Sequence, residues 1–263
     1  MKYGFIGCGN MGGALATAIA KTTTDIMLAD YSQEKAIALA DKLGCSYGTN
    51  EEIIQCCDRI FLGVKPQVMG DMLSSLSSLL QEKKPTLITM AAGLSLEKIE
   101  TLAGGNLPVI RIMPNTPVAV GKGMVLHCKN ALVSDETIAD FVTDMRYAGT
   151  LDALDEDLID AGCSLSGCGP AFMYMYIEAL AKGATECGLP FEKAIKYATV
   201  TMEGAARLAL SSDKTPEVLR QEVCSPGGST IQGVISLEES SFREDAADAI
   251  KKAYKRNKEL SEC

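Results

Sequence analysis

A glycine-rich motif close to the N-terminus constrains the fold of this chain more than any other feature. The run Gly7-Cys8-Gly9-Asn10-Met11-Gly12 matches G-x-G-x-x-G, a pattern that is weak alone. Here it follows a predicted strand, Lys2–Ile6, and opens an Ala-rich predicted helix, Met11–Lys21. In that setting the first glycine permits a tight turn, the second admits a pyrophosphate, and the third allows close helix–strand packing. The helix N-terminus would bind the phosphate. A glycine-rich turn without a ligand is the alternative.

Short apolar runs alternate with helical patterns through the first half of the chain. This alternation predicts a parallel sheet with right-handed crossovers, a Rossmann-like α/β domain. The remaining strands are expected at Asp25–Ala29, Arg59–Val64, Thr86–Met90 and Val109–Met113. Helices are expected at Gln33–Leu43, Pro66–Leu80 and Asp135–Tyr147, with a short strand pair around Gly123–Cys128.

Strand patterns stop after Asp155, and only helical runs follow. We therefore predict a dinucleotide-binding domain over 1–154 and an all-helical domain for substrate binding and dimerisation over 155–263. Several helices are apolar on more than one face, which favours burial against a second chain over a tight monomeric bundle. The helices are expected at Pro170–Cys187, Pro190–Leu210, Pro216–Val223, Thr230–Glu239 and Phe242–Leu260.

Composition excludes several classes of function for these 263 residues. The formal net charge of −9 and the lack of a basic block argue against nucleic acid as a partner. No apolar run approaches the length of a membrane span, and the N-terminal residues do not resemble a signal peptide. The ten cysteines and the single His127 show no zinc-ligand spacing, so no metal is expected. We expect reduced thiols, a structural histidine and a cytoplasmic protein.

The end of the second predicted strand bears on the choice of dinucleotide. Asp30 lies roughly 20 residues after Gly7, where a carboxylate binds the adenosine ribose hydroxyls. A carboxylate repels a 2′-phosphate, and Tyr31 and Ser32 follow it instead of an arginine. This pattern favours NADH over NADPH. The alternative is that Asp30 caps the helix beginning near Gln33.

Small residues end the next two strands. The segments Gly63-Val64-Lys65-Pro66 and Met90-Ala91-Ala92-Gly93 leave room for a flat nicotinamide ring at the carboxyl ends of a parallel sheet. Lys65 fits a charge near the cofactor and an ordinary surface cation equally well. The two prolines of Arg111-Ile112-Met113-Pro114-Asn115-Thr116-Pro117 predict a rigid exit loop, either a wall of the site or a structural turn.

The helical half contains the run Ser225-Pro226-Gly227-Gly228-Ser229-Thr230 before an apolar helix. Its glycines permit close backbone approach, its hydroxyls can donate hydrogen bonds, and the amides opening the helix would face a bound anion. This segment suits a small carboxylate. An ordinary turn between helices is the alternative.

These motifs together resemble the pyrroline-5-carboxylate reductase family, nearly from end to end. Besides the segments above, Leu165-Ser166-Gly167-Cys168-Gly169-Pro170-Ala171 contributes to the resemblance. The resemblance implies a nucleotide-binding N-terminal domain and a helical C-terminal domain that forms a homodimer, which in some members assembles further. It also implies reduction of 1-pyrroline-5-carboxylate to L-proline by NAD(P)H, the last step of proline biosynthesis.

The resemblance also assigns roles to residues. Gly7, Cys8, Gly9, Asn10, Met11, Gly12, Asp30, Tyr31, Ser32, Asn50, Val64, Lys65, Pro66, Ala91 and Ala92 would line the cofactor. Ser225, Gly227, Gly228, Ser229 and Thr230 would hold the substrate, with Thr230 or water passing a proton to the ring nitrogen. Asp30-Tyr31 departs from the Asn-Arg or serines that many members use for NADPH. Cys168 replaces a common serine, which should alter only packing.

Two other functions compete with this interpretation. A β-hydroxyacid dehydrogenase opens with a similar motif but needs Gly-x-x-Gly-x-x-x-Lys, which does not follow Gly167. A non-catalytic nucleotide-sensing protein would need a DNA- or partner-binding module, and the acidic chain shows none.

Overall fold

The computed structural model describes residues 2–261 and divides into two compact units. Unit 1 contains the residues up to Cys168 together with those from Ala253 onward, and unit 2 contains Gly169–Lys252. Each unit is described by itself. The predicted domain boundary between 154 and 155 stays a prediction.

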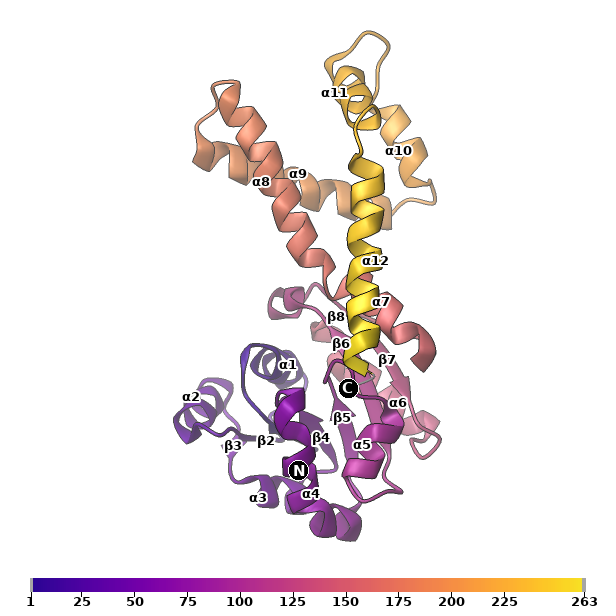
Figure 1. Ribbon diagram of the computed structural model, residues 1–263. Coiled ribbons are helices and arrows are strands. Elements are labelled where there is room, and N and C mark those ends of the chain that lie inside the picture. Colours follow the sequence, from indigo (N-terminus) through magenta and orange to yellow (C-terminus); the bar gives the residue numbers. More distant parts are fainter. Residues whose placement is uncertain (1, 262–263) are drawn as a thin grey trace. The chain divides into compact units, whose positions relative to one another are not determined.

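Unit 1 is built on an eight-stranded sheet with the order β3-β2-β1-β4-β5-β6-β7-β8 (Figure 1). The six strands from β3 to β6 run parallel, β7 is antiparallel to β6, and β8 is parallel to β7. The strands are β1 (Tyr3–Ile6), β2 (Ile26–Ala29), β3 (Ser46–Tyr47), β4 (Arg59–Leu62), β5 (Thr86–Thr89), β6 (Val109–Pro114), β7 (Gly123–Lys129) and β8 (Gly149–Ala153). Strand order reverses between β1 and β4, and open α/β sheets bind their ligands at the carboxyl ends of the strands at such a point.

Helices cover both faces of this sheet, and successive strand residues point to opposite faces. Phe5 packs into one core cluster with α1 and α2, and its neighbour Ile6 packs into another with α3 and α4. Phe5 also stacks on Phe61 at 4.4 Å between ring centroids. The helices are α1 (Asn10–Ala20), α2 (Gln33–Leu43), α3 (Asn50–Cys56), α4 (Pro66–Lys83), α5 (Leu96–Leu102), α6 (Asp135–Asp144) and α7 (Ile159–Ser166). Short 3₁₀ turns occur at Thr116–Val120, Met145–Tyr147 and Glu156–Leu158.

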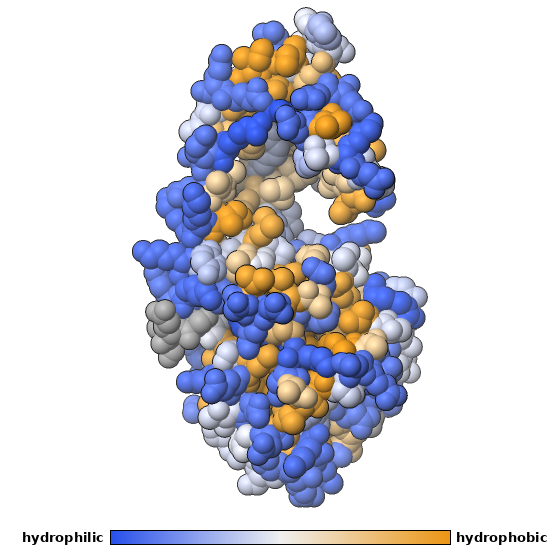
Figure 2. Space-filling model, turned by 90° about the vertical axis from the view of Figure 1, so that its right-hand side faces the viewer, coloured by the Kyte–Doolittle hydropathy of each residue, from blue (hydrophilic) through white to orange (hydrophobic). Residues whose placement is uncertain are grey.

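Unit 2 consists of helices that bury very few of their own hydrophobic side chains. Its elements are α8 (Gly169–Glu186), α9 (Phe191–Leu210), α10 (Pro216–Glu222), α11 (Ser229–Glu238) and the first part of α12 (Phe242–Ser261). Ala181 and Ala194 are its buried hydrophobic residues, whereas Tyr174 and Met175 are 58% and 67% exposed. Figure 2 shows apolar residues reaching the surface of the chain. Apolar helices without a core of their own need a second surface to cover them.

The sequence predictions agree with these elements in most places. The five predicted strands of the parallel sheet and the five late helices are confirmed, with ends that agree to within two residues. β3, β8, α3, α5 and α7 were not predicted, and the region around Gly123–Cys128 is a single strand, not a pair. His127 lies on β7 as expected and is 7% exposed. Among residues 2–261, no helix is long and apolar enough to cross a membrane.

Candidate active site

The predicted cofactor residues of unit 1 gather where five neighbouring parallel strands end. Gly7 follows β1, Asp30 follows β2, and Val64 comes two residues after β4. Ala91 comes two residues after β5, and Asn50 opens α3 shortly after β3. Because parallel strands share one carboxyl edge, this sheet brings segments separated by up to about 80 residues to one edge.

Three glycines at this edge are in backbone contact with one another. Gly7 has φ +102°, and a Cβ there would lie 2.7 Å from the Gly63 carbonyl oxygen. A Cβ on Gly12 would lie 2.1 Å from the Gly7 oxygen, and one on Gly63 would lie 2.5 Å from it. Gly9 differs, because a Cβ there would meet nothing within 4 Å. Its backbone is therefore open to an approaching phosphate, which fits a dinucleotide.

Two helix N-termini face this edge without a capping side chain. α1 begins after Gly9, and α4 begins after Lys65, with Pro66 in its first turn. Neither first turn contains an acidic residue. Uncapped amides and the positive end of the helix dipole favour an anion, so α1 meets the requirement for phosphate binding.

The Asp30 carboxylate joins the second strand to the glycine motif. Its Oδ2 accepts a hydrogen bond from the Cys8 amide at 2.7 Å, and its Oδ1 accepts one from the Ser32 amide at 2.9 Å. Ser32 is the N-cap of α2, so Asp30 does not cap that helix as the alternative interpretation held. Tyr31 is fully exposed beside it. Sequence reasoning missed the bond to Cys8, because it joins residues that are far apart in the chain.

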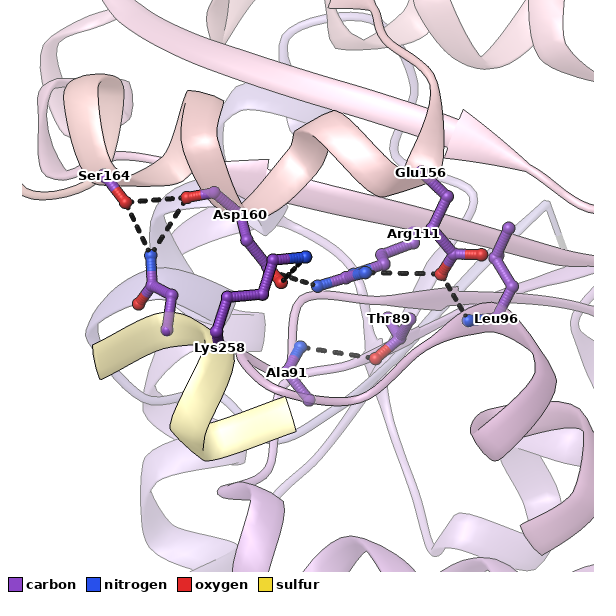
Figure 3. A network of polar contacts seen from close by, with 9 residues as sticks. Thr89, Ala91, Leu96, Arg111, Glu156, Asp160, Ser164 and Lys258 are labelled. Carbon is purple, nitrogen blue, oxygen red and sulfur yellow. Dashed lines mark hydrogen bonds and ion pairs between the residues drawn. The ribbon is translucent and has the colours of Figure 1, made fainter. Parts of the chain in front are cut away.

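The loop after β5 is held by side chains behind it (Figure 3). The Ala91 amide donates to Thr89 Oγ1 at 3.3 Å, and the Leu96 amide donates to Glu156 Oε1 at 2.7 Å. Arg111 lies on β6, in the strand predicted at Val109–Met113, and is 3% exposed. Its guanidinium pairs with Glu156 at 3.3 Å and with Asp160 at 3.0 Å. Arg111 is thus a buried support of this region.

The predicted carboxylate loop lies in unit 2, between α10 and α11. Gly227 has φ +71°, and the Gly228 amide donates to the Ser225 carbonyl at 3.0 Å, which closes a tight turn. Gly228 is the N-cap of α11, without a capping side chain and without an acidic residue in the first turn. Thr230 is the second residue of the helix and is exposed, so it is not the cap. Ser225 and Ser229 are exposed as well.

The thiol of the glycine motif, Cys8, is held in its protonated form. Burial, helped by the nearby Asp30 charge, raises the pKa of Cys8 to about 12. Cys8 donates weakly to the Ala29 carbonyl at 3.4 Å. The nine cysteines of the described residues are all free thiols, and residues 2–261 contain no His, Cys, Asp and Glu cluster suited to a metal.

Comparisons with known proteins decide the family. A model of pyrroline-5-carboxylate reductase dimerisation matches residues 156–260, and a model described as NADP oxidoreductase, coenzyme F420-dependent, matches residues 2–93. Pyrroline-5-carboxylate reductase of Escherichia coli is 36% identical over 265 residues, covering 99% of this chain and 98% of that protein. The chain belongs to the pyrroline-5-carboxylate reductase family.

Solved structures of this family agree with the fold. The reductase from Coxiella burnetii has a TM-score of 0.91 at 32% identity, covering 99% of this chain and 98% of that one. The Plasmodium falciparum reductase, solved with NADP bound, has a TM-score of 0.88 at 30% identity, covering 99% and 98%. The Rossmann-like unit followed by the helical part is therefore the architecture of pyrroline-5-carboxylate reductases, and the helical part matches their dimerisation domain.

Proposed function

We propose that this chain reduces 1-pyrroline-5-carboxylate to L-proline with NADH or NADPH, the last step of proline biosynthesis. The observation that carries the proposal is the edge of unit 1, where uncapped amides, an open Gly9 backbone and five strand ends meet. Relatives that match 99% of the chain support the reaction. A β-hydroxyacid dehydrogenase or a nucleotide sensor has no comparable support.

In this proposal the dinucleotide phosphates bind the amides that begin α1. The backbone from Gly7 to Gly12 holds the pyrophosphate, and the residues after β2 and β3, including Asn50, hold the adenosine side. Val64, Lys65 and Pro66 with Ala91 and Ala92 form the surface for the nicotinamide. When bound, the reduced dinucleotide supplies a hydride. In this proposal the residues of unit 1 orient the dinucleotide, and none of them gains or loses a proton during hydride transfer.

The substrate carboxylate binds the loop from Ser225 to Thr230. The amides that open α11 have no capping side chain or acidic neighbour, which supports an anion there. The substrate carbon of the C=N bond is already electrophilic, so binding and orientation supply most of the catalysis. Thr230 hydrogen-bonds the ring nitrogen, holds the C=N group in position and helps pass the proton that this nitrogen carries.

NADH is the proposed preferred dinucleotide. The Asp30 carboxylate at the end of β2 would repel a 2′-phosphate, and exposed Tyr31 offers no cation to attract one. The two backbone amides on Asp30 leave lone pairs for ribose hydroxyls, because a carboxylate has about four acceptor sites. A structural relative with NADP bound shows that the family also accepts the phosphorylated form.

The helical part forms a homodimer in this proposal, with further assembly open to it. The support is the lack of a core in unit 2 and its match to a dimerisation model. The nine free thiols suit the reducing cytoplasm, where we place the protein.

The proposed function is tested by supplying 1-pyrroline-5-carboxylate as substrate and measuring the oxidation of the reduced dinucleotide by its loss of absorbance. Proline formed should equal dinucleotide consumed. Purified protein that binds dinucleotide yet turns over no pyrroline-5-carboxylate would refute the reductase assignment. Specificity constants measured with NADH and with NADPH test the preference separately, and a clear advantage for NADPH would contradict it.

A further inference from the structure

The end of α12 packs against the loop that follows β5. Gly93 has φ +79°, and a Cβ there would lie 2.6 Å from the Leu260 carbonyl oxygen and 2.9 Å from its carbonyl carbon. The last turn of α12 thus lies directly on the backbone of the residue after Ala91 and Ala92. Both segments belong to unit 1, although about 165 residues of chain separate them.

Polar contacts fasten this last turn to α7. The Asn257 side-chain amide donates to the Asp160 carbonyl oxygen at 3.2 Å and to Ser164 Oγ at 3.1 Å. Lys258 Nζ lies 3.5 Å from Asp160 Oδ2 (Figure 3). Ser164 is fully buried, and the Asp160 side chain is 10% exposed, so these contacts are shielded from water. The turn is therefore anchored, not merely laid on the surface.

The same polar network reaches the other end of the loop. Asp160 pairs with Arg111, Arg111 pairs with Glu156, and Glu156 accepts the amide of Leu96, the first residue of α5. The loop between β5 and α5 is therefore bounded by Glu156 on one side and by the anchored turn of α12 on the other. Ala92, which precedes Gly93 in this loop, is exposed.

We propose that the last turn of α12, Asn257–Leu260, is a positioning element for the dinucleotide. It holds the 91–93 backbone where the nicotinamide end would bind, and Asn257 is its main anchor. This inference rests on the proposed function, which assigns Ala91 and Ala92 to the cofactor. None of the residues of the turn touches the reacting atoms in this proposal; they act through Gly93.

Dinucleotide binding measured by calorimetry tests the inference without turnover. Asn257→Ala removes the shielded hydrogen bonds to Asp160 and Ser164, so we expect the Kd for the preferred dinucleotide to rise roughly three- to ten-fold. Lys255→Ala is the matched control, because Lys255 is exposed on the same helix, and its Kd should stay at the wild-type value. The substrate KM should change much less than the dinucleotide KM in Asn257→Ala.

A double-mutant cycle with Gly93→Ala tests the coupling itself. In the wild-type background the added methyl group meets the anchored Leu260 carbonyl and should weaken dinucleotide binding. Once Asn257→Ala has released the turn, the same methyl group can displace it. The combined increase in Kd should therefore be smaller than the product of the two single increases.

Two results would overturn the inference. An unchanged Kd in Asn257→Ala, together with a lowered Tm, would assign the turn to stability alone, and so would strict additivity in the cycle. If Asn257→Ala does not fold, Lys258→Gln is read in the same way; it removes the ion pair to Asp160 and the contact of the Lys258 ammonium with the Tyr254 ring. Wild-type protein that binds neither NADH nor NADPH would refute the proposed function as well. That outcome differs from equal Kd values in wild type and Asn257→Ala, which would refute only the role of the turn.

Discussion

Asp30→Asn should weaken the glycine motif itself, not only the choice between dinucleotides. The Asp30 carboxylate accepts the Cys8 amide at 2.7 Å through one oxygen and the Ser32 amide at 2.9 Å through the other. Asparagine has one oxygen and an NH₂ group, so one of the two amides would face a donor. The bond to Cys8 is the one that fixes the loop between β1 and α1.

The expected cost follows from these two bonds. A hydrogen bond to a charged group contributes roughly 1.5–3 kcal/mol and one to a neutral group roughly 0.5–1.5 kcal/mol. Asparagine loses one bond and weakens the other, and the partial exposure of Asp30 reduces the loss. We expect about 2–3 kcal/mol, which lowers the Tm by about 4–12 °C at roughly 2–4 °C per kcal/mol.

Thermal unfolding measures the loss of stability in Asp30→Asn, and dinucleotide titration measures the change in affinity. Asp30→Asn should lower the Tm and weaken both NADH and NADPH, with the larger loss for NADH because its ribose contact is also changed. Tyr31→Arg is the matched control: it adds a cation at a fully exposed position, so it should favour NADPH at an unchanged Tm. Asp30→Asn with a wild-type Tm and only a changed ratio of affinities would refute the argument that Asp30 braces the motif.

Three further predictions concern the rest of the chain. Thr230→Ala should lower kcat/KM for pyrroline-5-carboxylate about ten- to a hundred-fold and leave dinucleotide affinity nearly unchanged; intact kinetics with a lower Tm would contradict its role at the ring nitrogen. Light scattering should show a dimer at all active concentrations, because unit 2 buries so little alone, and an active monomer would contradict this. Burial lowers the pKa of His127 below 6.5, so the folded state resists protonation, and the stability that this brings is present above pH 6.5 and lost as pH falls below it. Denaturant unfolding at pH 7.5 and 5.5 should show this loss, and His127→Gln should reduce it.

Much of the fold was predictable because buried strands and glycine turns leave strong local patterns. Lys2–Ile6 and Thr86–Met90 are apolar runs of strand length, and Gln33–Leu43 was predicted with the bounds it has. β3 has two exposed residues, Ser46 and Tyr47, and exists because the edge of β2 offers partners. No local pattern can report such a pairing.

The candidate site also has a part that the sequence predicts and a part that it does not. The positions of predicted cofactor residues at strand ends follow from the order of strands and helices, although their roles remain predictions. Contacts that join distant segments left no sequence signal. The Cys8–Asp30 bond and the Asn257 contacts to α7 connect residues 22 to 97 positions apart. Arg111 lies in the predicted strand Val109–Met113, but nothing near it in the sequence indicated its ion-pair partners, Glu156 and Asp160.

The mutual contact of Gly7, Gly12 and Gly63 restricts how this chain can diverge. At each of these positions a new side chain would collide with backbone atoms, at distances of 2.7, 2.1 and 2.5 Å. A substitution elsewhere can shorten a side chain but cannot remove a carbonyl group, so no second mutation compensates. Gly4 differs, because a Cβ there would meet the Ile53 side chain at 2.4 Å, which a smaller residue at 53 would relieve. At position 4 the obstacles are side chains, Ile53 and then Cys57 at 3.2 Å, which substitutions can change, whereas at positions 7, 12 and 63 the obstacle is backbone.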